Sequence, residues 1–134
     1  MRQYGYENSI EDFNKKSVQV AKEAIKNSKK DVALAGSVST FGNFYKLGVK
    51  AMVPGFDEQL KILSGEGVDL IILEAMSSQA DIVETMLNCS TKISIPVWLS
   101  VSCVTNDQNQ IMLGYNDSID SDTNIYENFE ISIN

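Results

Sequence analysis

The chain has 134 residues, with 11 Lys and Arg against 18 Asp and Glu, no His, and a formal net charge of -7. This length fits one domain, and the negative charge repels phosphate backbones, so we expect no nucleic-acid partner. The longest aliphatic run, residues 70–73, is far shorter than the roughly 20 residues that span a bilayer. The first residues contain no apolar signal core. We therefore expect a cytoplasmic protein without a membrane partner.

The two cysteines limit the metal chemistry. Cys89 and Cys103 are 14 residues apart and form no C-x-x-C pair, whereas a zinc site takes three or four ligands. One copy of the chain therefore cannot build a self-contained Cys/His zinc site, and we predict no metal site. In a reducing cytosol both cysteines are expected to be small buried thiols. The lack of His excludes catalytic triads that need a His base.

The first predicted element is a helix from Ser9 to about Ser28. Ser9 is a good N-cap, and carboxylates follow in the first turn, where the helix dipole favours them. Helical spacing predicts one apolar stripe, made of Ile10, Phe13, Val20, Ala21 and Ala24.

A short buried strand is predicted within residues 31–38, ending near Gly36. Residues 40–53 show no clear period and are predicted to be irregular. The Pro54-Gly55 pair is predicted to open a second helix, and the glycines at 65 and 67 to end it. The apolar face of this helix is predicted to contain Phe56, Leu60 and Leu63.

Residues 68–73 (VDLIIL) form the clearest predicted strand. They are apolar on both faces apart from Asp69, which is typical of a parallel sheet, and Glu74 follows directly. Ser77 or Ser78 is predicted to cap a third helix, whose apolar residues are Ile82, Val83, Met86 and Leu87. The last predicted strand is 95–103, in which Trp98 is expected to pack in the core.

Helices and strands therefore alternate, which predicts an α/β fold with about three parallel strands and right-handed crossovers. We treat 1–134 as a single domain that ends in an acidic segment, 104–134. Within that segment, 125–133 alternates weakly, as a strand would. The open sheet would leave two edges and one face uncovered, which predicts self-association as a homo-oligomer.

Candidate site residues lie just past the carboxyl ends of the strands, where parallel sheets place functional groups. Glu74 is expected to be partly desolvated and to need a cation or several donors. It either accepts a substrate ammonium group or caps the next helix. Gly36 and Ser37 either admit a ligand close to the backbone or form an ordinary turn. No phosphate-binding glycine pattern occurs.

Four segments resemble the homocysteine S-methyltransferase family, over about residues 6–102. The segments are 6–13 (YENSIEDF), 33–38 (ALAGSV), 59–74 (QLKILSGEGVDLIILE) and 96–100 (PVWLS). They are similar to the family's Y-x-A-S-x-x-G-F, V-A-G-S-[VIL], Q-x-x-x-L-x-x-x-G-V-D-L-x-x-x-E and P-x-W-x-S segments. The third match is the most specific.

The resemblance implies part of a (β/α)₈ barrel, from the end of strand two through strand five. The complete enzyme would transfer a methyl group from a donor to the thiol of homocysteine, giving methionine. Glu74 would accept the homocysteine ammonium group and Tyr6 would line the pocket, together with Gly36 and Ser37.

In the resembled family, zinc held by three cysteines activates the thiol, and neither cysteine of this chain matches those positions. We therefore expect a fragment with no catalytic residue and no cofactor of its own, inactive alone. Two alternatives remain: a non-catalytic remnant that binds an amino acid or a partner chain, and an unrelated small α/β domain.

Overall fold

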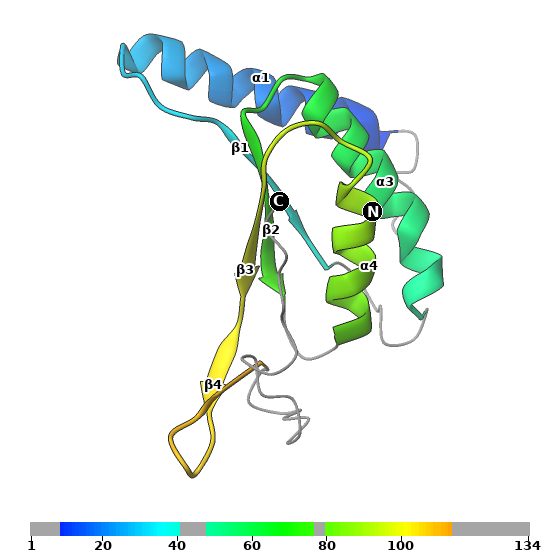
Figure 1. Ribbon diagram of the computed structural model, residues 1–134. Coiled ribbons are helices and arrows are strands. Elements are labelled where there is room, and N and C mark those ends of the chain that lie inside the picture. Colours follow the sequence, from blue (N-terminus) through cyan, green and yellow to red (C-terminus); the bar gives the residue numbers. More distant parts are fainter. Residues whose placement is uncertain (1–8, 41–47, 77–79, 114–134) are drawn as a thin grey trace.

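The computed structural model describes residues 9–40, 48–76 and 80–113 (Figure 1). Its elements are α1 (Ile10–Ser28), β1 (Ala35–Ser39), α3 (Val49–Gly65), β2 (Leu70–Met76), α4 (Ala80–Ser90), β3 (Val97–Val101), β4 (Cys103–Thr105) and β5 (Ile111–Leu113). Up to β3, helices and strands alternate as predicted, which confirms the α/β class. No helix among these residues is both long and apolar enough to cross a membrane.

The three longer strands form one parallel sheet in the order β1-β2-β3. Ser39 pairs with Glu74 and Ile71 pairs with Val97. The prediction of three adjacent parallel strands is therefore confirmed. Glu74 lies within β2 rather than after it, because the pairing with β1 continues to this residue. Within the described chain the sheet is open, and β1 and β3 are its edges.

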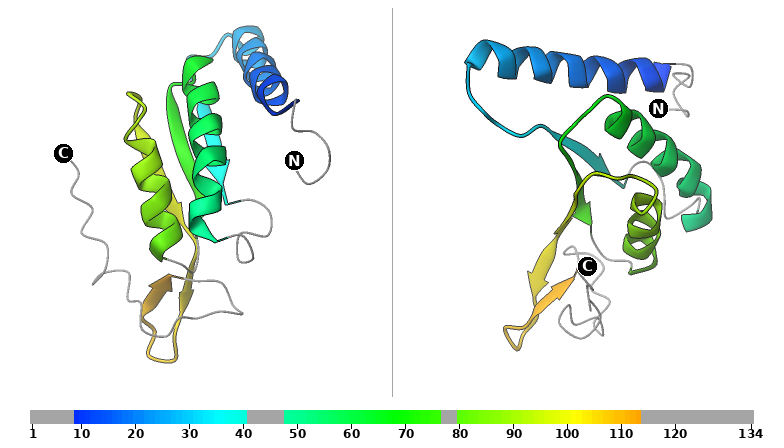
Figure 2. Two further views of the ribbon diagram at one scale, coloured as in Figure 1. Left: turned by 90° about the vertical axis from the view of Figure 1, so that its right-hand side faces the viewer. Right: turned by 45° about the horizontal axis from the view of Figure 1, so that its top comes forward.

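Helices α3 and α4 lie on one side of the sheet, whereas α1 contacts α3 and runs across the plane of the sheet past its edge (Figures 1 and 2). In the left view of Figure 2, α4 and α3 run along the strands, and α1 follows beyond α3, seen nearly end-on. Buried apolar side chains fill the space between helices and strands: Val38, Met52, Phe56, Leu60, Leu63, Val68, Ile71, Leu73, Ile82, Val83 and Met86. The predicted apolar faces of α3 and α4 are thus confirmed, with Leu87 partly buried.

Helix α1 contacts α3 through a different side from the predicted one. Val18 is its buried residue, whereas Phe13 and Val20 are 51% and 54% exposed. Each residue turns a helix by about 100°, so these two side chains lie nearly opposite Val18. The predicted apolar stripe therefore lies mostly to the side of the contact with α3, and its members Ile10 and Ala21 are half-buried. The helix ends at Ser28, as predicted.

Helix α3 begins at Val49, so the prediction that Pro54-Gly55 opens it is wrong. Pro54 lies inside the helix, where it costs one backbone hydrogen bond. The side chains of Met52 and Phe56 are buried on either side of it, and this burial favours the helical turn over an irregular one. The end is as predicted, with Gly67 in the left-handed region (φ 73°).

The strands are buried on one face only. Gly36 and Val38 are buried, whereas the alternate residues Ala35 and Ser37 are exposed, so the prediction of a buried first strand is correct for one face only. Trp98 is 63% exposed, which contradicts the predicted core position. Its place in the alternation of β3 puts it on the side of the sheet opposite the helices.

A hairpin that was not predicted follows β3. Strands β4 and β5 pair antiparallel, and Asn106 organises the turn between them. Its Oδ1 accepts hydrogen bonds from the backbone N–H groups of Gln108 (3.0 Å) and Gln110 (2.9 Å). Asn109 adopts φ 59°, a conformation that Asn tolerates better than most residues.

Some predictions fall outside the described residues. These are the helix caps Ser77 and Ser78, the possible strand 125–133, and Tyr6 of the predicted substrate pocket.

Candidate substrate-binding site

The helix-free face of the sheet carries a hydrogen-bonded Ser37–Glu74 pair. Ser37 lies on β1 and Glu74 on β2, and both are exposed. The Ser37 Oγ donates a hydrogen bond to Glu74 Oε2 over 2.5 Å, a length typical of a hydroxyl bonded to a carboxylate. Since Ser39 is the residue opposite Glu74, Ser37 is a diagonal neighbour on the same face. The bond orients one carboxylate oxygen, and the other can receive a ligand.

Glu74 is exposed, which corrects the expectation that it is partly desolvated. The reason is that the helices cover only the other face of the sheet. Its hydrogen bond goes to Ser37 on the neighbouring strand. Within the described contacts, the geometry therefore favours a role on this face over capping of the following helix.

Gly36 faces the opposite side of the sheet from Glu74. A Cβ atom added here would lie 2.9 Å from Ile71 Cδ1, and 3.3 Å from both Leu63 Cδ1 and Val68 Cγ2. Close packing of α3 and β2 against β1 therefore explains the glycine. Contact of its backbone with a ligand stays a prediction.

An apolar surface adjoins the Ser37–Glu74 pair. Ile72 pairs with Ser37 on one side and with Trp98 on the other, so the three side chains share one face. This face combines a hydroxyl, a carboxylate, an aliphatic side chain and an exposed indole. Chemically, it offers an acceptor for a cationic group beside an apolar surface. The spacing of two residues between Trp98 and Ser100 indicates in the sequence that they share a face of the strand, but not that this face is the helix-free one.

The described residues do not form a zinc site. They contain no group of three or more His, Cys, Asp or Glu side chains that could hold a metal ion. Cys89 is buried, whereas Cys103 is exposed, so the prediction of two buried thiols is correct for Cys89 alone. These donors do not fit the zinc of the resembled family.

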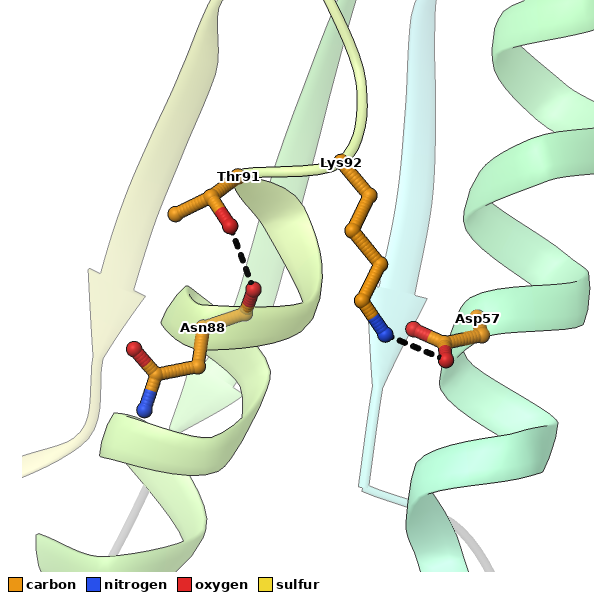
Figure 3. Close-up of polar contacts among 4 residues, drawn as sticks. All are labelled: Asp57, Asn88, Thr91 and Lys92. Atoms are coloured by element: carbon orange, nitrogen blue, oxygen red, sulfur yellow. Dashed lines mark hydrogen bonds and ion pairs between the residues drawn. The ribbon is translucent and has the colours of Figure 1, made fainter.

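A second polar cluster lies between α3 and the end of α4 (Figure 3). The Lys92 Nζ contacts Asp57 Oδ2 at 2.6 Å, and the Thr91 hydroxyl donates to the carbonyl of Asn88. Burial, reinforced by the neighbouring Asp57, raises the pKa of Cys89, so this thiol is protonated at neutral pH. A hollow of about 530 Å³ lies beside the cluster. It is near the amino ends of the strands, away from Glu74, and the ion pair fastens α4 to α3.

Fold and site together define an α/β protein with an exposed carboxylate near the carboxyl ends of parallel strands. The family model for homocysteine S-methyltransferases matches residues 1–127. The chain therefore belongs to the homocysteine S-methyltransferase family, which confirms the resemblance of its motifs. Neither a curated protein nor a solved structure matches it.

Proposed function

We propose that the chain is a homocysteine-binding part of a homocysteine S-methyltransferase, in which Glu74 accepts the ammonium group of the substrate. The Ser37–Glu74 pair on the helix-free face is the observation that supports this proposal. The three strands would be consecutive strands of a (β/α)₈ barrel. In such a barrel the helices lie outside and the active site lies at the carboxyl ends of the strands, which agrees with the placement of Glu74.

The bound amino acid would be oriented by its charge. Its ammonium group would lie at Glu74, and its methylene chain would lie along Ile72. Tyr6 and the backbone at Gly36 would complete the pocket. A hydrogen bond to a charged group contributes about 1.5–3 kcal/mol, and solvent exposure places this one at the lower end. Loss of the carboxylate should therefore weaken binding about tenfold.

In the complete enzyme a methyl group moves from a donor to the homocysteine sulfur. The new C–S bond forms as the bond between methyl group and donor breaks, and the thiol loses its proton, giving methionine. The described residues of this chain position the amino acid but assemble no zinc site that would activate the thiol. We therefore propose that the 134-residue chain binds homocysteine in the cytoplasm without methylating it, as a non-catalytic amino-acid-binding protein would.

Calorimetric titration with L-homocysteine tests the proposal. Glu84, an exposed residue of α4, provides a control that removes an equal charge elsewhere. We expect binding by the unmodified chain and by Glu84→Gln, and about tenfold weaker binding by Glu74→Gln. Equal affinities of the two variants would contradict the role of Glu74. Formation of methionine from a methylsulfonium donor would contradict the proposed inactivity.

A further inference from the structure

The single tryptophan of the chain, Trp98, lies exposed on the helix-free face. Its exposed fraction is the largest among the exposed large apolar side chains of the described residues. Stabilisation by an apolar side chain follows the area that folding removes from water, so this indole contributes little to the stability of the described fold. Packing within the described part of the chain therefore does not explain why a tryptophan is present here.

The strand register places Trp98 beside the carboxylate of Glu74. Trp98 pairs with Ile72, which pairs on its other side with Ser37, so the three residues form one row across the sheet. Glu74 lies two residues further along β2, which makes Ser37 and Trp98 its diagonal neighbours on the same face. Neighbouring strands are about 4.8 Å apart and alternate residues about 6.6 Å. Diagonal Cα atoms are therefore about 8 Å apart, a distance that glutamate and tryptophan side chains can bridge.

The hydrogen bond to Ser37 shows how the carboxylate lies. The hydroxyl of a serine stays close to its own backbone, yet Ser37 Oγ is 2.5 Å from Glu74 Oε2. The Glu74 side chain must therefore lean back toward the row that also contains Trp98. Ile72 lies in this row between the hydroxyl and the indole, and it is half-buried. A cation bound by the carboxylate on the Ile72 side would face the indole.

The sheet is irregular at this point. Between Leu73 and Met76 the register of β2 against β3 shifts, because residues 74 and 75 of β2 oppose the single residue Ser100 of β3. Such bulges re-aim side chains and are common next to active sites. Ser100 is exposed and its side chain is small. The β3 side of Glu74 is therefore left open for a ligand.

We propose that Trp98 is a specificity residue of the homocysteine site, in which the face of its indole contacts the ammonium group that Glu74 binds. This inference rests on the proposed function. An aromatic face attracts a cation electrostatically, and tryptophan does so most strongly. Because Glu74 is exposed, water competes with the ammonium group for the carboxylate, and an indole over the cation excludes part of that water. The contact favours ligands with a cationic amino group over those without one.

Calorimetry with homocysteine and with 4-mercaptobutanoic acid, which lacks only the amino group, tests the proposal. The variants are Trp98→Leu, which keeps an apolar side chain without an aromatic face, and Trp98→Phe, which keeps the face. Because Trp98 is exposed, circular dichroism should show an unchanged fold in both. We expect the preference for homocysteine to fall about two- to fivefold in Trp98→Leu and to be largely restored in Trp98→Phe. In a Glu74→Gln chain, Trp98→Leu should not lower the preference further, because the ammonium group is no longer held beside the indole.

A second measurement needs no variant. Since Trp98 is the only tryptophan, the intrinsic tryptophan fluorescence reports on this contact. At equal occupancy, we expect homocysteine to change the emission more than 4-mercaptobutanoic acid does. Equal changes in emission, or the same preference in the unmodified chain and in Trp98→Leu, would overturn the inference and leave the proposed function standing. Failure of the unmodified chain to bind homocysteine would overturn both.

Discussion

Replacing Gly36 with Ala tests whether this glycine is needed for packing of the core or only for ligand binding. The new Cβ would lie 2.9 Å from Ile71 Cδ1 and 3.3 Å from Leu63 Cδ1, and both neighbours are buried. They cannot move into solvent, so overpacking should cost about 1–3 kcal/mol. Alanine also restricts the unfolded chain more than glycine does, and this effect stabilises the folded state by about 0.4–1 kcal/mol. We therefore expect a net loss of about 1 kcal/mol in the free energy of unfolding.

Gly65→Ala is the matched control for this experiment. Gly65 is the last residue of α3, and nothing lies within 4 Å of a Cβ atom added there. Because the same substitution meets open space, it should stabilise the protein by about 0.5–1 kcal/mol. Urea denaturation followed by circular dichroism measures both changes at one protein concentration. A Gly36→Ala chain as stable as Gly65→Ala would refute the packing argument.

Three further predictions concern exposure and titration. Trp98 is exposed and Phe56 is buried, so Trp98→Ala should lower the free energy of unfolding by less than about 1 kcal/mol and Phe56→Ala by about 3–5 kcal/mol. Similar losses for the two variants in urea denaturation would contradict the placement of Trp98 on the helix-free face. A thiol reagent such as 5,5′-dithiobis(2-nitrobenzoic acid) should modify Cys103 at once and Cys89 only in denaturant, because Cys89 is buried; rapid modification of both would contradict its burial. The pKa of Cys89 is raised from its ordinary 9.0 by burial, and that of Lys92 from 10.5 by its hydrogen bond to Asp57. The stability that each group contributes is complete below its ordinary pKa and is lost as the pH rises through its pKa in the folded protein. Urea midpoints should therefore fall above about pH 9, and they should fall less in Cys89→Ala. Urea midpoints that do not change with pH would contradict both pKa shifts.

The element order was predictable because the apolar pattern is strong in residues 56–63, within the second helix, and in the strand of residues 68–73. The start of that helix was not, since Pro54 resembles a helix opening. The burial of Met52, a tertiary effect, favours the earlier turn. The exposure of Trp98 could not be predicted from the sequence either. A strand pattern shows which residues share a face but not which face the helices cover.

Glu74 was found from its position at a strand end and from the family motif, but its partner was not. The contact with Ser37 depends on the register between β1 and β2. A shift of one residue would turn Ser37 to the helix side, and nothing in the two segments alone fixes that register. The sequence therefore predicts Glu74 as a site residue, and the structure shows that Ser37 is its hydrogen-bond partner.

The most direct test of the Glu74 assignment compares homocysteine with 4-mercaptobutanoic acid, which lacks only the amino group. Their affinities are measured by calorimetry for the unmodified chain and for Glu74→Gln. We expect the unmodified chain to prefer homocysteine about tenfold, and the preference to fall close to one in the variant. The same preference in both proteins would contradict the claim that this carboxylate, oriented by Ser37, receives the ammonium group.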